Sequence, residues 1–472
     1  MLVERLTRRM VTPVSSAGMV LQACHSVGAT CDDRLQNCRF RCLKCQIQAP
    51  EIAWYTGSVS LVDRSIGSSI NSLIDEEPVV IVQGPRACGK TTLVQQLCTQ
   101  RDRDLLDVGQ PSEFVVASQD PAAYLAGRDE PVFIDEFQRV PNLLAVIKKS
   151  VDRTPRVGAF VLTGSTTQDL LPKGTETLAG RSAVTTMWGF SQGELLGVRE
   201  RFIDRLFDSP TELMDHRSTL LRPDYAKAVA TGGFPEAIRR TRVDAKRRWQ
   251  LEYAARVADR DLAELVQIRR PGVFRSVLEL SAARTSDVTN INKMSSDLGA
   301  GREAVNGYIE LLERVFLLRR LRVYSRNVGV RVTSHPKLHV TDSGLATALS
   351  RLDENTIGRD VHFGHLLESF VVAEIVKQLG WSQSRCEPWF FRDQEANEVD
   401  LVLERQDGLL VGIEVKAGVT VGPPEAKGLR TLRAAVGERF VHGVVLYTGT
   451  GSFRIDNDPQ ISAHPVSTLW AN

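Results

Sequence analysis

The chain has 472 residues, of which 25% are charged, and a formal net charge of +2 at neutral pH. Domains of about 150 residues are typical, so this length predicts roughly three domains with separate cores. The near-neutral balance excludes a global basic field, so any contact with nucleic acid must come from local patches. No run of roughly 18 apolar residues occurs, and the sequence therefore predicts no transmembrane span.

The first 56 residues differ from the rest, because they are rich in Cys, Arg and Ser and show no sustained helical or strand period. They resemble a secretion signal ending in a lipoprotein-like box at Cys24, but Pro13 and Gly18 interrupt the apolar stretch. They could instead form a disordered extension, or reflect a start assigned too far upstream, which is the interpretation we favour. A third interpretation is a zinc site built from Cys31, Cys38, Cys42 and Cys45.

A strand, a loop and a helix are predicted in succession from Val79 onward. The apolar run Val79–Val82 leads into GPRACGKTT, and LVQQL follows. In the spacing G-x-x-x-x-G-K-T, glycines let backbone N–H groups surround a phosphate, and the next helix presents its positive N-terminal end. The pattern predicts an ATP-binding P-loop formed by Gly84, Pro85, Arg86, Ala87, Cys88, Gly89, Lys90, Thr91 and Thr92.

The chemistry expected of this loop needs Mg²⁺ and a group that activates water. Lys90 would reach the β- and γ-phosphates, and the Thr91 hydroxyl would bind Mg²⁺. The later run Val132–Ile134 ends in Asp135 and Glu136, which is the pattern of a Walker B strand. Asp135 would hold Mg²⁺ through water, and Glu136 would polarise the water that attacks the γ-phosphate.

A further strand, GAFVLTGS, ends in the polar run Thr163–Thr166. A polar side chain there suits the sensor position of ATPases that carry an extra strand between the P-loop and Walker B strands. Arg181 precedes the strand SAVTTMWGFS and is a candidate for the γ-phosphate charge, in its own chain or toward a neighbouring subunit; a surface arginine is the alternative. Five strands alternating with helices predict a parallel α/β sheet.

Residues 205–285 are predicted to be helical, with a core stripe at Trp249, Tyr253 and Val257. Residues 286–335 follow as helix, turn, helix and strand, typical of a winged helix. The second helix could enter a DNA major groove, or the segment could be a packing module between domains. Acidic residues among its exposed positions favour the packing module slightly.

A second chemical pattern lies in the C-terminal part. Glu368 lies on a predicted helix, Asp400 on the strand NEVDLVL, and Glu414 and Lys416 on the strand LLVGIEVKAG. Alternation places Glu414 and Lys416 on one face of their strand, and places Val399, Leu401 and Leu403 on the face opposite Asp400. The order is similar to a PD-(D/E)XK nuclease site, in which Asp400 and Glu414 would bind Mg²⁺, Glu368 would support them, and Lys416 would activate water.

The motifs together resemble bacterial and archaeal AAA-superfamily ATPases with a C-terminal domain of unknown function. The resemblance covers residues 59 to 470 and rests on GPRACGKTT, FIDEFQRVPNLL, LTGST, LAGR, TGGFPEAI, KLHVTDSGL, GHLLESFVVAEI, NEVDLVL and GIEVKAG. It implies an ATPase fold followed by a helical segment, a winged-helix-like segment and a restriction-endonuclease-like fold. The expected domains are 57–204 for the ATPase, 205–285, 286–335, and 336–472 for the nuclease-like part.

Two functions remain open on these grounds. The first is an ATP-hydrolysing, DNA-associated enzyme whose nucleotide state gates a Mg²⁺-dependent nuclease-like domain. The alternative is a non-cleaving regulator that binds DNA or a protein partner and uses the nuclease fold as a platform. The scattered thiols Cys88, Cys98 and Cys386 and the need for ATP predict a cytoplasmic location, while the pattern does not fix the oligomeric state.

Overall fold

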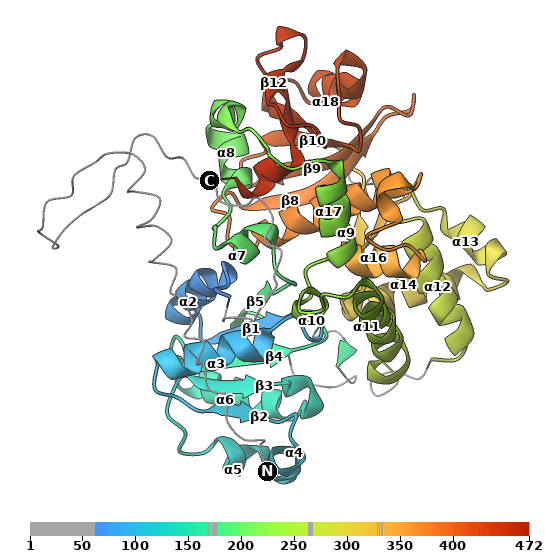
Figure 1. Ribbon diagram of the computed structural model, residues 1–472. Coiled ribbons are helices and arrows are strands. Elements are labelled where there is room, and N and C mark those ends of the chain that lie inside the picture. Colours follow the sequence, from blue (N-terminus) through green and yellow to red (C-terminus); the bar gives the residue numbers. More distant parts are fainter. Residues whose placement is uncertain are drawn as a thin grey trace, which may run out of the picture. The chain divides into compact units, whose positions relative to one another are not determined.

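The computed structural model describes residues 62–167, 170–171, 177–262, 268–327, 329, 331 and 334–471 (Figure 1). These belong to one compact unit whose bounds are residues 49 and 472. No helix in this part is long and apolar enough to cross a membrane. The secretion-signal, zinc-site and extension interpretations of the first 56 residues lie outside the described residues.

Five parallel strands form the N-terminal sheet, in the order β2-β3-β4-β1-β5 (Figure 1). Strand β4 pairs with β1 on one side and with β3 on the other, so the expected extra strand between the P-loop and Walker B strands is confirmed. Because the strands are parallel, their carboxyl ends meet at one edge. The strands are β1 Val79–Gln83, β2 Leu105–Asp107, β3 Val132–Asp135, β4 Phe160–Gly164 and β5 Ser182–Thr186.

Helices cover both faces of this sheet. Successive strand side chains point to opposite faces, so Val80 and Val82 join one apolar cluster and Val79 and Ile81 join another. The first cluster includes residues of α2 and α3, and the second includes residues of α5 and α6. These elements are α2 Ile66–Glu76, α3 Lys90–Gln100, α4 Pro111–Gln119, α5 Pro121–Leu125, η1 Phe137–Arg139 and α6 Leu143–Arg153.

A mostly helical stretch follows the sheet. The predicted core stripe is confirmed, because Tyr253 and Val257 are buried and the Trp249 ring stacks on Tyr253 with 5.2 Å between ring centroids. Phe234 packs on both aromatic rings. The elements are α7 Gln192–Leu196, α8 Phe202–Asp208, η3 Pro210–Asp215, α9 Arg222–Thr231, α10 Pro235–Ile238, α11 Val243–Arg256, the π-helical turn η4 Val257–Asp261 and α12 Pro271–Ala283.

The predicted helix-turn-helix is present as α13 Ile291–Asp297 and α14 Arg302–Arg314. The strand after α14, β6 Leu318–Leu321, pairs antiparallel with β7 Lys337–Val340. Strand β7 lies beyond the expected boundary at residue 335, so the small sheet spans the two segments that the sequence separates. The sequence missed this pairing because residues 322–336, which separate the two strands, carry no two-residue hairpin signal.

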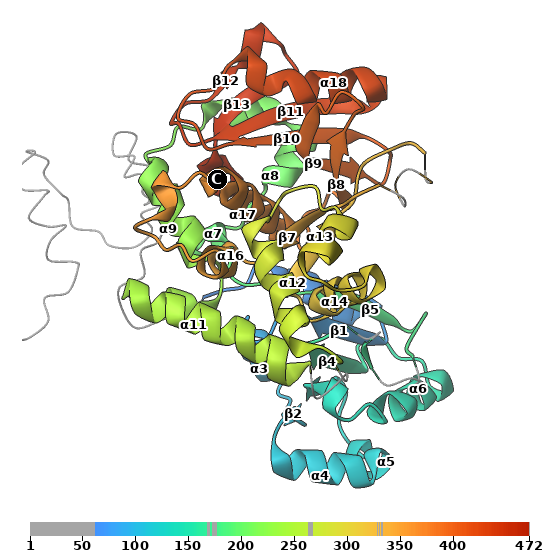
Figure 2. The same ribbon diagram turned by 90° about the vertical axis from the view of Figure 1, so that its right-hand side faces the viewer.

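The C-terminal sheet is mixed and has six strands, in the order β12-β13-β11-β10-β9-β8. Figure 2 shows helices α17 and α18 on opposite sides of this sheet. The strands are β8 Cys386–Arg392, β9 Glu398–Arg405, β10 Leu410–Lys416, β11 Phe440–Tyr447, β12 Phe453–Arg454 and β13 Ile461–Pro465. The helices are α16 Ser343–Leu349, η5 Ile357–Arg359, α17 Phe363–Gln378, η6 Pro423–Ala426, α18 Lys427–Val436, η7 Gly437–Arg439, η8 Ile455–Asn457 and η9 Val466–Trp470.

The predicted alternation holds on β10 and fails on β9. On β10, Val411, Ile413 and Val415 join the cluster that contains α17, whereas Gly412 faces Leu429 and Leu432 of α18. On β9, Leu401 and Leu403 also face α17, but Val399 packs with the α18 cluster. The ladder between β9 and β10 ends at the pair Leu401 and Ile413, so the strands separate beyond it. The expectation that Val399 shares a face with Leu401 is therefore wrong.

One continuous apolar cluster joins the N-terminal and C-terminal parts. It contains residues from α2 and α3, from the helical stretch, from α14 and from α17, and it reaches Trp470. A second cluster fills the other face of the parallel sheet, and a third lies between the mixed sheet and α18. The shared middle cluster means that the two sheets are packed against one helical layer.

Helix α18 approaches β9 so closely that a glycine is required. A Cβ on Gly428 would overlap the carbonyl oxygen of Glu398 and lie 3.4 Å from Val399 Cγ2. We expect Gly428→Ala to lower the free energy of unfolding by about 1–3 kcal/mol through overpacking. Gly307 on α14 has open space around it, so Gly307→Ala is the matched control and should stabilise by about 0.5–1 kcal/mol. Equal shifts of the thermal midpoint in both variants would contradict this packing.

Candidate nucleotide-binding site and carboxylate cluster

The loop between β1 and α3 has the backbone conformation that its glycines allow. Gly84 has φ +156°, and a Cβ there would overlap the carbonyl oxygen of Met187. Gly89 has φ +102° and forms the N-cap of α3 in the left-handed region, where a side chain is strained. The loop therefore curls directly into the N-terminus of α3, where unpaired N–H groups favour an anion.

The Lys90 side chain lies inside this loop. Its Nζ donates to the carbonyl oxygens of Gly84 at 2.9 Å and Pro85 at 3.0 Å, and the residue is buried. A protonated amine that is held only by neutral carbonyl groups keeps its charge available for phosphate oxygens. This placement agrees with the phosphate-binding role expected from the sequence.

The predicted Mg²⁺ ligands meet at the carboxyl edge of the parallel sheet. Thr91 Oγ1 donates to Asp135 Oδ2 at 2.6 Å. The other oxygen, Asp135 Oδ1, accepts from the Glu136 N–H at 3.1 Å and from Thr163 Oγ1. Burial raises the pKa of Asp135, although the bonds from Thr163 and Thr91 act in the opposite direction. A divalent cation would stabilise this buried carboxylate in its charged form.

Glu136 follows directly and adopts a left-handed conformation with φ +55°. Its Oε2 accepts from Ser165 Oγ at 3.1 Å and from Gln138 Nε2. Gln138 Nε2 also donates to Ser165 Oγ at 3.0 Å, so the three groups form a closed polar set. The strained backbone turns the carboxylate toward the end of β4, where the sequence predicts the sensor residue.

Two residues outside the motif hold the P-loop in place. The Arg64 guanidinium, with 6% of its side chain exposed, donates to the Cys88 carbonyl at 2.9 Å and pairs with Glu194 at 3.1 Å. The Tyr253 hydroxyl of α11 donates to the Arg86 carbonyl at 3.0 Å. The loop is thus tied to the helical stretch as well as to its own sheet.

Arg181 lies just before the amino-terminal end of β5, whereas the P-loop follows the carboxyl-terminal end of the neighbouring strand β1. Strand β5 begins at Ser182 opposite Val79, whereas the P-loop follows Gln83, four residues further and about 13 Å along the strand. The Arg181 side chain pairs with Asp152 of α6. A role at the γ-phosphate of its own chain does not fit this position, and a role toward a neighbouring subunit stays a prediction.

The C-terminal acidic residues gather around a lysine that the sequence did not single out. Lys337 Nζ lies 2.7 Å from Glu368 Oε1, 2.6 Å from Glu398 Oε1 and 3.0 Å from Asp400 Oδ1. Its side chain is 1% exposed, and it comes from β7, the strand that pairs with β6. Burial alone would lower the pKa of Lys337, but the surrounding carboxylates raise it well above the ordinary value.

The remaining members of the cluster are Glu414 and Lys416. Lys416 Nζ donates to Glu414 Oε1 at 2.6 Å, and Glu414 Oε2 is buried without a hydrogen-bond partner in the described part of the chain. Burial and the charge of Asp400 raise the pKa of Glu414 to about 8. Burial would also raise the pKa of Asp400, but Lys337 and Lys416 hold it below its usual value. The carboxylates predicted to share a site do lie together.

The two sites differ in their fit to Mg²⁺. At the P-loop, Thr91 and Asp135 supply hard oxygen ligands, and Asp135 accepts hydrogen bonds from the neutral groups of Thr91, Thr163 and the Glu136 backbone, which fits this ion. In the C-terminal cluster, Asp400 Oδ1 accepts a hydrogen bond from Lys337 Nζ, and Asp400 Oδ2 accepts one from the Val415 N–H at 2.9 Å. Among the described residues, no group of three or more His, Cys, Asp or Glu is arranged to hold a metal. The C-terminal residues as placed do not fit Mg²⁺.

Helix α17 links this cluster to the ATPase part. Glu368 lies in its first half, and Glu374 and Lys377 lie near its end. Glu374 Oε2 accepts the Gln192 N–H at 2.8 Å, and Lys377 Nζ donates to the Phe190 carbonyl at 2.9 Å. The segment after β5 is therefore bonded to the helix that carries Glu368. Sequence reasoning missed these contacts because they join residues more than 180 positions apart.

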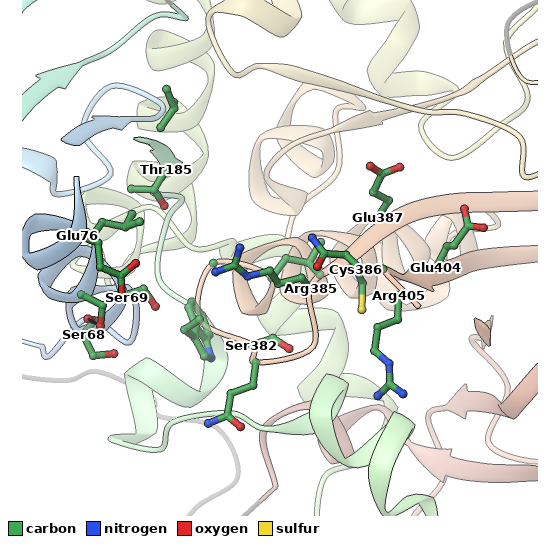
Figure 3. A pocket seen from close by; sticks show the side chains of 18 of the residues that line it. Ser68, Ser69, Glu76, Thr185, Ser382, Arg385, Cys386, Glu387, Glu404 and Arg405 are labelled. Atoms are coloured by element: carbon green, nitrogen blue, oxygen red, sulfur yellow. Dashed lines mark hydrogen bonds between the residues drawn. The ribbon is translucent and has the colours of Figure 1, made fainter. Parts of the chain in front are cut away.

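A wide cleft is separate from both sites. It has a volume of about 1020 Å³ and lies between α2, β5 and the start of β8. Figure 3 shows Ser68 and Glu76 on one side and Arg385 and Glu404 on the other. None of its lining residues belongs to the P-loop or to the carboxylate cluster. Its mixed polar lining indicates no particular ligand.

Three family models match successive parts of the chain. Residues 76–196 match an AAA domain (AAA_14). Residues 222–356 and 363–469 match two domains of unknown function, DUF8612 and DUF4143. With the P-loop geometry described above, the first match supports an AAA-type ATPase domain and hence nucleotide binding.

Similar proteins are found in several bacteria. Proteins of Mycobacterium tuberculosis and Mycobacterium bovis, both described as uncharacterized, are each 25% identical over 396 residues, which cover 84% of this chain and 82% of theirs. An uncharacterized protein of Haemophilus influenzae is 21% identical over 304 residues, covering 63% of this chain and 66% of its own.

Two solved structures were also found to be similar. The Walker-type ATPase PABY2304 of Pyrococcus abyssi has 14% identity and a TM-score of 0.37, and the match covers 61% of this chain and 96% of that one. The RuvB Holliday junction branch migration motor of Thermotoga maritima has 17% identity and a TM-score of 0.25, over 54% of this chain and 87% of that one.

The buried Arg64 gives a test of what holds the P-loop. Arg64→Met would leave the 1% exposed Glu194 without its countercharge, so we expect the free energy of unfolding to fall by about 3–5 kcal/mol. Arg284→Met is the matched control, because Arg284 forms a half-exposed pair with Asp297, worth about 0–1 kcal/mol. Thermal unfolding compares the two. Similar losses in both variants would show that Arg64 does not anchor the loop.

Proposed function

We propose that this chain binds ATP with Mg²⁺ at the P-loop and hydrolyses it. The observation that carries the proposal is the convergence of Lys90, Thr91, Asp135 and Glu136 on one edge of the parallel sheet. The edge also receives the N-terminus of α3, whose dipole favours the phosphates. The AAA domain match over the same residues supports the proposal.

Each side chain has a role that its position allows. Lys90 would turn from the Gly84 carbonyl to phosphate oxygens, while Thr91 and Asp135 would hold Mg²⁺, which supplies positive charge to the triphosphate. Glu136 would orient the attacking water and accept its proton. Because Glu136 is bonded to Ser165 and Gln138, it would have to exchange one of those bonds for one to water during turnover.

Substitutions at the two charged residues separate binding from turnover. Lys90→Ala should abolish nucleotide binding, whereas Glu136→Gln should bind ATP but hydrolyse it at least about a hundredfold more slowly. Lys149→Ala removes an exposed lysine of α6 and is the control. Binding of a fluorescent ATP analogue and phosphate release report the two steps. Unchanged affinity in Lys90→Ala would refute the assignment.

For the C-terminal part, we propose a non-cleaving platform in preference to a Mg²⁺-dependent nuclease-like domain gated by nucleotide. Lys337 among the acidic residues supports this choice, since it fills the position a divalent cation would need. Cleavage of a supercoiled plasmid with Mg²⁺ that is lost in Asp400→Ala would favour the nuclease instead. We retain the expectation that nucleotide state alters what this platform binds, in a cytoplasmic setting.

The proposed coupling has a direct physical route. Gln192 and Phe190 follow β5, which lies beside the P-loop strand, and both bond to the end of α17. ATP could change partner affinity only through a difference in its own affinity for two arrangements, so the partner must change ATP affinity in return. The oligomeric state would affect ATP hydrolysis only if Arg181 contacts the γ-phosphate bound by a neighbouring subunit.

DNA is the partner that a specific groove favours. The groove lies between the N-terminal ends of α13 and α14 and strand β6. Arg320 in it is neutralised by Glu313 at 3.0 Å, but Arg302 and Arg322 have no acidic partner at ion-pair distance among the described residues. Glu303 is the one acidic side chain in the lining. The lining comprises Ile291, Asn292, Arg302, Glu303, Asn306, Arg320, Arg322, Arg331, Ser334, His335 and Pro336.

Removing the two arginines tests DNA binding at this groove. Arg302→Ala with Arg322→Ala should weaken binding of a duplex uniformly across sequences and reduce the salt slope by about 2, because two phosphate contacts are lost. Arg284→Ala is the control, since it is already paired with Asp297 outside the groove. Fluorescence anisotropy at several salt concentrations measures both quantities. An unchanged slope would favour the packing-module or protein-partner alternative.

A further inference from the structure

The carboxylate cluster holds its own cation. The Lys337 ammonium has three carboxylate oxygens within 3.0 Å and is buried almost completely. The Phe390 ring of β8 lies with its centroid 5.8 Å from Nζ. Nζ donates hydrogen bonds to Glu368 Oε1 and Asp400 Oδ1, and Glu398 Oε1 lies at ion-pair distance, so acidic groups surround the ammonium.

The position of Nζ coincides with the space a divalent ion would need. An ion bound by both Glu368 and Asp400 must approach each oxygen to about 2.1 Å. Nζ already lies within hydrogen-bond distance of the same two oxygen atoms. The second Asp400 oxygen already accepts the Val415 N–H at 2.9 Å, so both oxygens of this carboxylate have hydrogen-bond donors.

We propose that Lys337 is the resident cation of this cluster, and that it takes the place of a divalent metal while tying the small β6–β7 sheet to the C-terminal sheet. This inference deepens the proposed non-cleaving platform and rests on it, but it is independent of ATP hydrolysis. The lysine comes from β7, while the acids come from α17 and β9. The ion pairs therefore join β7, α17 and β9, and β7 in turn pairs with β6.

The acidic residues of the cluster outnumber its amines. Four acidic residues of the cluster, Glu368, Glu398, Asp400 and Glu414, face two amines, Lys337 and Lys416. Without the Lys337 ammonium, closely spaced carboxylates remain around a small space, and oxygen-rich sites of this kind suit Mg²⁺ and Mn²⁺. Removing the Lys337 amine should thus create a metal site.

The test uses Mn²⁺ as the probe on the full chain without nucleotide, followed by electron paramagnetic resonance of free Mn²⁺. The wild-type protein should show no stoichiometric Mn²⁺ that depends on Asp400. Lys337→Met should gain one site, at least about tenfold tighter than any wild-type binding, and adding Asp400→Asn should remove it. Lys416→Met is the control that removes the other amine, and it should gain no such site because Lys337 remains.

Two results would contradict the role of Lys337. A Mn²⁺ site in the wild-type chain that Asp400→Asn abolishes would overturn it, as would a folded Lys337→Met that gains no site. Should Lys337→Met not fold, the comparison of wild type with Asp400→Asn still decides, because the proposal expects no difference in Mn²⁺ binding. ATP hydrolysis measured in the same proteins is a separate readout, so failure of the ATPase proposal is distinguishable.

Discussion

The structure depends on one helix that is buried on nearly all sides. Helix α17 has 13 buried residues among its 16, so it cannot place its charged side chains in water. Buried charges need partners, because desolvation of an unpaired ion is costly. Glu368 forms an ion pair with Lys337. Glu374 forms an ion pair with Lys377 and accepts a hydrogen bond from the Gln192 N–H. These obligatory pairs fix which segments lie against the helix.

The two ends of α17 therefore connect the two chemical centres of the chain. The first half of the helix pairs with Lys337 of β7, and its end is bonded to the segment that follows β5 of the ATPase sheet. The shared apolar cluster fills the space between them. A rearrangement near the P-loop could thus be transmitted to the C-terminal sheet through helix α17, whose charged side chains are paired at both sites. These contacts, and not spatial proximity alone, are the physical basis for the proposed coupling.

Local pattern was sufficient to predict much of this organisation. The succession of five strands along the chain, the P-loop, the Walker B residues and the helix with Glu368 each follow from periodicity or spacing within short windows. The alternation on β9 failed at Val399 because strand separation depends on the neighbouring helix α18, which the local pattern does not include. Lys337 was missed for a similar reason, since only tertiary contacts bring a lysine from β7 to acids on α17 and β9.

Hydrogen–deuterium exchange with and without ATP and Mg²⁺ tests the central claim that nucleotide binding is coupled to the C-terminal part through α17. We expect slower exchange in the P-loop, in Gln192–Leu196 and in Phe363–Gln378 when ATP is bound, because the Gln192 and Phe190 contacts connect these segments. Protection confined to the parallel sheet and its loops, with exchange in α17 unchanged, would contradict it.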